Sequence, residues 1–171
     1  FQSDGSKAFN SKINYNGQLA INPFDLNLKI DLNNYKISNL LRPNSIINEF
    51  IKSGLLFNEN ISIHTLVNIK STKKDKIFNE AKLELKVLNG KINFDKSMFI
   101  NNNIGLLEVS NSDLFLENDR LILTANLSID IKNIDRLYSF LNTNKRLRKD
   151  IKNIKLNIIY DLLGDEIAFK N

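Results

Sequence analysis

His64 is the only histidine of the 171-residue chain, and its imidazole is the first group to test for chemistry. It lies in a run of alternating residues, on the side opposite Ile61, Ile63 and Val67, where a strand would point it to solvent. The chain has no cysteine, so nothing completes a zinc site of the usual nitrogen and sulfur type or a thiol nucleophile. The glycines are scattered singly, and no serine stands in a glycine-rich elbow. The sequence therefore predicts no catalytic residue, no metal, no cofactor and no enzymatic activity.

Basic residues are densest near the C-terminus, and such a cluster could bind phosphate groups. The cluster comprises Lys145, Arg146, Arg148, Lys149, Lys152 and Lys155. A solvated loop leading into a strand is one interpretation, and contact with lipid headgroups through Lys145, Arg146, Arg148 and Lys149 is another. Nucleic-acid binding is not expected, because no aromatic residue for base stacking lies between Phe140 and Tyr160. The formal charge of +5 is modest, and abundant Lys, Asn and Ile also fit an AT-rich genome.

The elements that would position these residues are strands with one apolar face. From Phe24 to Leu32 every even position is apolar and every odd position between them is polar. Successive side chains of a strand point to opposite faces, so this segment has one apolar and one polar face, which is typical of antiparallel sheets. Similar runs recur at 61–69, 81–87, 92–94, 121–131 and 154–162. Asn89-Gly90 is a favoured hairpin turn, and Asn16-Gly17, Glu117–Arg120 and Leu163–Asp165 are further predicted connections.

Two segments have apolar residues at helical spacing instead. Pro43–Gly54 has a cap at Asn44 or Ser45 and ends at a glycine, and Asn133–Leu141 has Asn133 as its cap. No linker or composition shift divides the chain, so residues 1–171 are expected to form one unit. The fold class is predicted as mainly β: a long curved antiparallel sheet of eight or nine strands with two short helices. Two short helices cover only part of such a sheet, which leaves its apolar face either closed into a core or open as a groove.

Three stretches resemble the C-terminal region of AsmA-like proteins. They are Leu88–Phe94 with its Leu-Asn-Gly-Lys-Ile hairpin, Ile104–Leu114 with its Ser-Asn-Ser step, and the long alternating strand Asp119–Ile131. The helix 135–141 and the strand 151–160 are also similar to that region. The resemblance covers residues 80–171 best, and it is closest to members from AT-rich Gram-negative bacteria of the alphaproteobacterial type. Because the chain starts at Phe1 without an initiator methionine, it is expected to be a segment of a longer protein.

The resemblance implies a location and a partner. AsmA-like proteins are anchored in the inner membrane and extend through the periplasm as a curved sheet with a hydrophobic groove. They are linked to phospholipid transport between the membranes and to outer-membrane biogenesis. The expected partners are thus phospholipid acyl chains, a membrane reached through an upstream anchor, and envelope proteins. The alternative is a closed β-sandwich that binds proteins during envelope assembly. The residues expected to line the groove are Phe24, Leu26, Leu28, Ile30, Leu83, Leu85, Val87, Leu121, Leu123, Leu127, Ile129, Leu156, Ile158 and Tyr160.

Overall fold

A computed structural model describes residues 1–8, 11–39, 49, 51–71 and 77–170. The strands are β1 (Gln2–Ala8), β2 (Ser11–Ile21), β3 (Phe24–Tyr35), β4 (Ile61–Ser71), β5 (Glu80–Leu88), β6 (Lys91–Asn93), β7 (Met98–Asn101), β8 (Gly105–Glu117), β9 (Arg120–Ile131), β10 (Asn153–Asp161) and β11 (Glu166–Lys170). The helical elements are the 3-10 turns η1 (Ile37–Asn39), η2 (Leu55–Phe57) and η3 (Lys145–Leu147), and the α-helix α2 (Ile134–Phe140).

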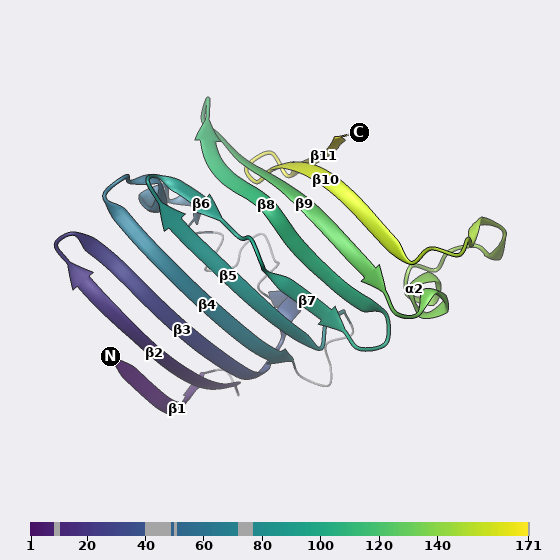
Figure 1. The fold of residues 1–171 in the computed structure, drawn as a ribbon, viewed down its shortest axis with the longest axis horizontal. Coiled ribbons are helices and arrows are strands. Elements are labelled where there is room, and N and C mark those ends of the chain that lie inside the picture. Colours follow the sequence, from purple (N-terminus) through teal and green to yellow (C-terminus); the bar gives the residue numbers. More distant parts are fainter. Residues whose placement is uncertain (9–10, 40–48, 50, 72–76, 171) are drawn as a thin grey trace.

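All of these strands belong to one open sheet, whose order follows the sequence from β1 to β11 (Figure 1). β6 and β7 share a single position, since each pairs with both β5 and β8. The prediction of a mainly β, open sheet is confirmed, and the closed sandwich is wrong because every described strand lies in this one sheet. The sequence predicted eight or nine strands rather than eleven. The polar β1 and the short β7 and β11 give little alternation by which to recognise them.

β3 and β4 form the one parallel pair among the described strands. The chain leaves β3 at Tyr35 and begins β4 at Ile61, beside the start of β3, so the connection between these two strands is a crossover. The predicted helix Pro43–Gly54 belongs to this crossover and lies mostly outside the described residues; Glu49, Ile51 and Lys52 are helical. Gly54 ends that helical turn with a φ of 77°, as its glycine predicted.

Several predicted connections have the expected geometry. Asn89 and Gly90 join β5 to β6 with φ angles of 51° and 69°, the left-handed values that a tight two-residue hairpin requires. The connections at 117–120 and 163–165 are also turns. The predicted hairpin at Asn16-Gly17 is wrong, because both residues lie within β2. Gly17 is instead covered by the ring of Phe1, which a Cβ would meet at 2.6 Å.

A bulge in the middle of the sheet explains the Ser-Asn-Ser step. The register of β8 shifts between Ser110 and Asp113, and Asn111 adopts a φ of 47°. The buried Ser112 then bonds to the segment between β6 and β7: its backbone N–H donates to Asp95 Oδ1 at 2.7 Å, and its Oγ accepts from Phe94 N at 2.7 Å. Polar groups in the bulge of β8 and in the segment between β6 and β7 therefore form hydrogen bonds with each other.

Candidate functional site

The register of the sheet places apolar side chains in continuous rows on one face. One row of directly paired residues crosses from β2 to β11 without a polar member: Leu19, Leu26, Ile63, Val87, Ile92, Leu114, Leu123, Tyr160 and Ile167. A second row joins Ile13, Leu32, Ile69, Ala81, Phe99, Leu107, Ile129 and Ile154. Because directly paired residues share a face, every residue predicted to line a groove lies on this apolar face.

Described residues of the connection between β3 and β4 cover the central part of the apolar face. Ile51 and Leu56 of the crossover pack in one buried cluster with Ile63, Val87 and Leu121 of the sheet, while Ile37 packs in a second with Ile69, Ala81 and Phe99. Val87 and Leu121 are each only 1% exposed. Phe24, Leu26, Leu85 and Leu123 pack against the first cluster, and Leu83 packs against the second. These seven predicted lining residues therefore contribute to the hydrophobic core.

From residue 127 of β9 onward, and across β10 and β11, the apolar face belongs to neither buried cluster. Leu127, Ile129, Leu156, Ile158 and Tyr160 are partly exposed there. Ile167 and Phe169 extend this surface onto β11 and are 60% and 64% exposed. We call the surface made by these seven residues the apolar strip. Leu28 and Ile30 are also partly exposed and outside both clusters, but they lie on β3, far across the sheet.

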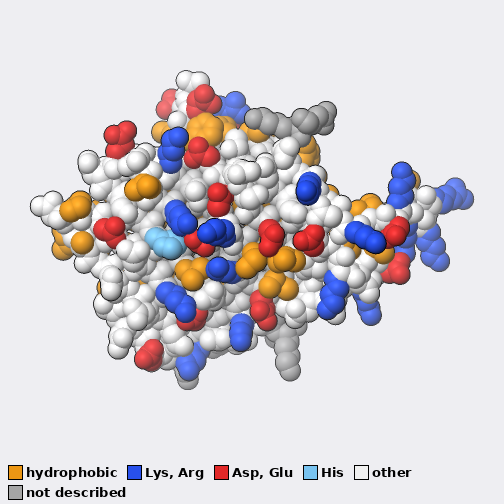
Figure 2. Space-filling view, in the orientation of Figure 1, with side chains coloured by type: hydrophobic (Ala, Val, Ile, Leu, Met, Phe, Trp, Pro, Cys, Tyr) orange, Lys and Arg blue, Asp and Glu red, His pale blue; other side chains and the backbone are white. Residues whose placement is uncertain are grey.

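The basic residues predicted from the sequence lie beyond one end of the apolar strip. We define the basic tip as residues 132–152, which contain α2 and η3 and connect the end of β9 to the start of β10. Figure 1 shows it projecting from one end of the molecule, and Figure 2 shows Lys and Arg side chains gathered at that end. Lys145, Arg146, Arg148 and Lys149 are all exposed in it. Lys155, which the sequence analysis placed in the same cluster, lies instead on β10.

Hydrogen bonds hold the basic tip in a defined shape. Asn133 caps α2 as predicted, its side-chain oxygen accepting from Arg136 N at 3.0 Å. The buried Tyr138 is the anchor: its hydroxyl accepts from Lys149 N at 2.7 Å and donates to the Lys149 carbonyl. The Arg148 guanidinium lies 5.6 Å from the centre of the Tyr138 ring and donates to Thr143 O. This role of Tyr138 was not predicted from the sequence, although an aromatic residue on the inward face of a predicted helix is a signal for it.

The opposite face of the sheet carries many charged side chains, and Figure 2 shows the one histidine there among basic and acidic side chains. His64 is exposed on this face as predicted, but it contacts a carboxylate that the sequence did not reveal. Its Nε2 lies 3.2 Å from Glu84 Oε1, and Lys86 Nζ lies 3.0 Å from the same oxygen. The hydrogen bond from Lys86 holds the Glu84 pKa below its ordinary value, with a further contribution from His64, while burial opposes the shift. The hydrogen bond between His64 and Glu84 therefore links β4 to β5.

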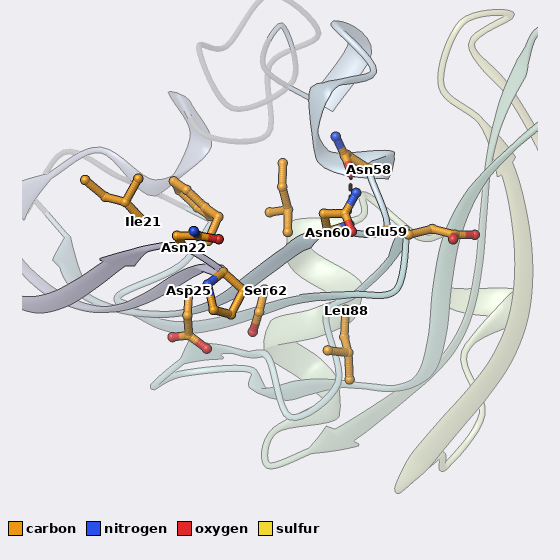
Figure 3. A pocket seen from close by; sticks show the side chains of 11 residues that line it. Ile21, Asn22, Asp25, Asn58, Glu59, Asn60, Ser62 and Leu88 are labelled. Atoms are coloured by element: carbon orange, nitrogen blue, oxygen red, sulfur yellow. Dashed lines mark hydrogen bonds between the residues drawn. The ribbon is translucent and has the colours of Figure 1, made fainter.

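Two hollows lie at the ends of the strands rather than on the apolar rows. The larger, of about 600 Å³, is shown in Figure 3 and is lined by the β2–β3 turn, the start of β4 and Leu88. Its rim is polar at Asp25, Asn58 and Glu59. The smaller, of about 390 Å³, lies beside the basic tip and includes Lys132 and Lys152. No sequence signal pointed to either.

Within the described ranges, no group of three or more His, Asp or Glu side chains could hold a metal ion. None of the helices there is long and apolar enough to span a membrane. Comparisons with protein-family models, with curated proteins and with solved structures found no match to this chain.

Proposed function

We propose that the chain is a non-catalytic β-groove segment that holds phospholipid acyl chains on its apolar strip. One observation carries the proposal: the apolar strip joins apolar residues that pair directly across β9, β10 and β11, and it is left outside both buried clusters. In soluble proteins, contiguous exposed apolar surface marks a binding site more often than inert surface.

The dimensions of the apolar strip suit one acyl chain. The strip extends along the strands from the level of Tyr160, which pairs with residue 123 of β9, to Ile129, and β9 rises by roughly 20 Å between these two levels. The hydrocarbon core of a bilayer is about 30 Å thick for two leaflets, so one chain occupies about 15 Å. Burial of ten methylenes would contribute roughly 8 kcal/mol to the binding free energy. This offsets the lower estimates of the free-energy cost of the translational and rotational entropy lost on association. A chain lying along the strip would have its headgroup in water, near the basic residues that follow β9.

The wider setting of the proposal rests on the AsmA-like resemblance of residues 80–171. We place the chain in the periplasm of a Gram-negative cell, as a segment of an inner-membrane-anchored protein. There it would support phospholipid transport between the inner and outer membranes, and so outer-membrane biogenesis. The uncovered apolar strip supports this setting, because an acyl chain could lie on it without a specific polar contact at each position.

Leu127 and Leu156 are the residues to change, because they are direct partners on β9 and β10 and lie outside the buried clusters. The double variant Leu127→Asp/Leu156→Asp should lose bound phospholipid by at least tenfold, measured by native mass spectrometry after purification without detergent. The matched control is Asn126→Asp/Asn157→Asp, which places the same two charges on the next pair, on the polar face. The control should keep its lipid. Lipid-free wild-type protein, or equal loss in both variants, would overturn the proposal.

A further inference from the structure

The net charge of the chain is concentrated in the basic tip. Residues 132–152 hold seven of the 24 Lys and Arg and two of the 19 Asp and Glu, so this stretch alone has a formal charge of +5. That equals the charge of the whole chain, and the remaining residues balance at 17 of each sign. A compositional bias toward lysine would raise the charge throughout the chain. The structure instead confines the excess to one projecting element.

Exposed apolar side chains accompany these charges. Leu147 is 70% exposed between Arg146 and Arg148, and Phe140 and Leu141 at the end of α2 are 46% and 58% exposed. A site for a soluble polyanion gains little from uncovered leucines. A membrane surface, in contrast, takes up both kinds of group, because cations contact anionic headgroups while apolar side chains enter the acyl boundary.

The hydrogen bonds of the basic tip keep both sets of side chains presented together. Tyr138 bonds to the backbone of Lys149 on both its N–H and carbonyl sides, which closes the loop that carries η3. The Asn144 side chain caps η3 by accepting from Arg146 N at 3.1 Å. Because this shape is already formed, less conformational entropy is lost on binding than for a flexible basic loop.

We propose that the basic tip docks this end of the sheet on an anionic membrane surface, with Leu147, Phe140 and Leu141 entering the interface and Lys145, Arg146 and Lys149 contacting headgroups. The apolar strip ends at this point, since Ile129 near the end of β9 and Ile154 at the start of β10 are direct partners. Docking does not depend on the apolar strip carrying lipid; the two proposals concern different residues.

Sedimentation with vesicles tests the proposal. The whole chain should bind vesicles made of equal parts phosphatidylcholine and phosphatidylglycerol, bind phosphatidylcholine vesicles far more weakly, and dissociate as salt screens the charges. Two basic residues at such a surface contribute roughly a thirtyfold gain in binding. Lys145→Glu/Arg146→Glu should therefore lower binding by at least that factor. The control Lys29→Glu/Lys91→Glu makes the same change in net charge at exposed positions of β3 and β6, and should bind like the wild type.

A second variant separates a membrane from a soluble polyanion. Leu147→Ser keeps every charge and changes a side chain that contributes little to the core. It should lower vesicle binding by roughly tenfold or more and leave any binding to a short single-stranded RNA unchanged. Absence of vesicle binding, equal loss in the Lys29/Lys91 control, or vesicle binding that is insensitive to Leu147→Ser would each overturn membrane docking. If the chain carries lipid in solution but does not bind vesicles, only membrane docking is contradicted. If it binds vesicles but carries no lipid, only the proposed function is contradicted.

Discussion

Gly105 at the start of β8 lies directly against the backbone of Asp130 on β9, so closely that a Cβ on Gly105 would overlap the Asp130 carbonyl oxygen. This contact sits where β8, the end of β9 and the basic tip meet, since Ile104 O also accepts from the backbone N–H groups of Lys132 and Asn133. A glycine is therefore required at position 105, because the close approach of the two strands leaves no room for a side chain.

Gly105→Ala should destabilise the protein more than the same change at Gly54. Both glycines have positive φ angles, of 155° and 77°, but a Cβ at Gly54 meets no atom within 4 Å. Gly54→Ala should cost about 1–2 kcal/mol from backbone strain alone. Gly105→Ala adds a clash that only a shift of β8 relative to β9 can relieve. Urea unfolding of both variants measures the difference, and equal losses would show that the close approach is not required.

The fourteen residues predicted to line a groove should divide into two groups by their effect on stability. Leu121→Ala should cost about 2–5 kcal/mol, because it leaves a cavity in the core cluster that Leu56 covers. Leu127→Ala removes the same atoms from a partly exposed site and should cost less than half as much. Urea denaturation of the two variants supplies the comparison. Similar costs would mean that the face is buried throughout, which would leave no open strip.

This division could not be predicted from the sequence, because Val87 and Leu127 occupy equivalent places in equally regular alternating runs. Periodicity fixes which face a side chain points to, and the register of the structure bears this out at every predicted lining position. What covers the face depends instead on contacts with Ile37 and Leu56, which lie between β3 and β4 and follow no local sequence pattern.

Contacts between distant residues set a second limit on sequence-based prediction. His64 and Glu84 are twenty positions apart, and they meet only because His64 pairs with Lys86 in the β4–β5 register. The Asn89-Gly90 turn and the Asn133 cap were predictable since each is decided within a few residues. The hairpin prediction at Asn16-Gly17 was wrong because this dipeptide also occurs within a strand. There the missing side chain of Gly17 leaves room for the ring of Phe1.

Stability should depend on pH through Glu84. Its folded pKa lies below the ordinary value of 4.5, chiefly because Lys86 donates to it, so the folded state holds fewer protons than the unfolded state near that pH. The contribution is complete above about pH 4.5 and is lost as pH falls through the lower, folded pKa. Glu84→Gln should therefore be less stable than the wild type at pH 7, and the gap should narrow toward pH 3. Urea unfolding midpoints at several pH values measure this difference in stability between the two proteins. A difference that does not change with pH would exclude the ion pair as its source.

Tyr138→Phe should loosen the basic tip without altering its charge. The substitution keeps the ring beneath Arg148 but removes the hydroxyl, which leaves the Lys149 N–H and carbonyl without their partner. A backbone N–H or carbonyl left without a hydrogen-bond partner lowers the free energy of unfolding by about 1–3 kcal/mol where it is shielded from water. Amide exchange should accelerate at residues 145–149 and stay unchanged in the β4–β5 ladder, which serves as the internal control. If docking relies on the formed tip, vesicle binding should fall as well, even though all seven cations remain. Unchanged exchange and unchanged binding would show that Tyr138 merely fills space beneath the loop.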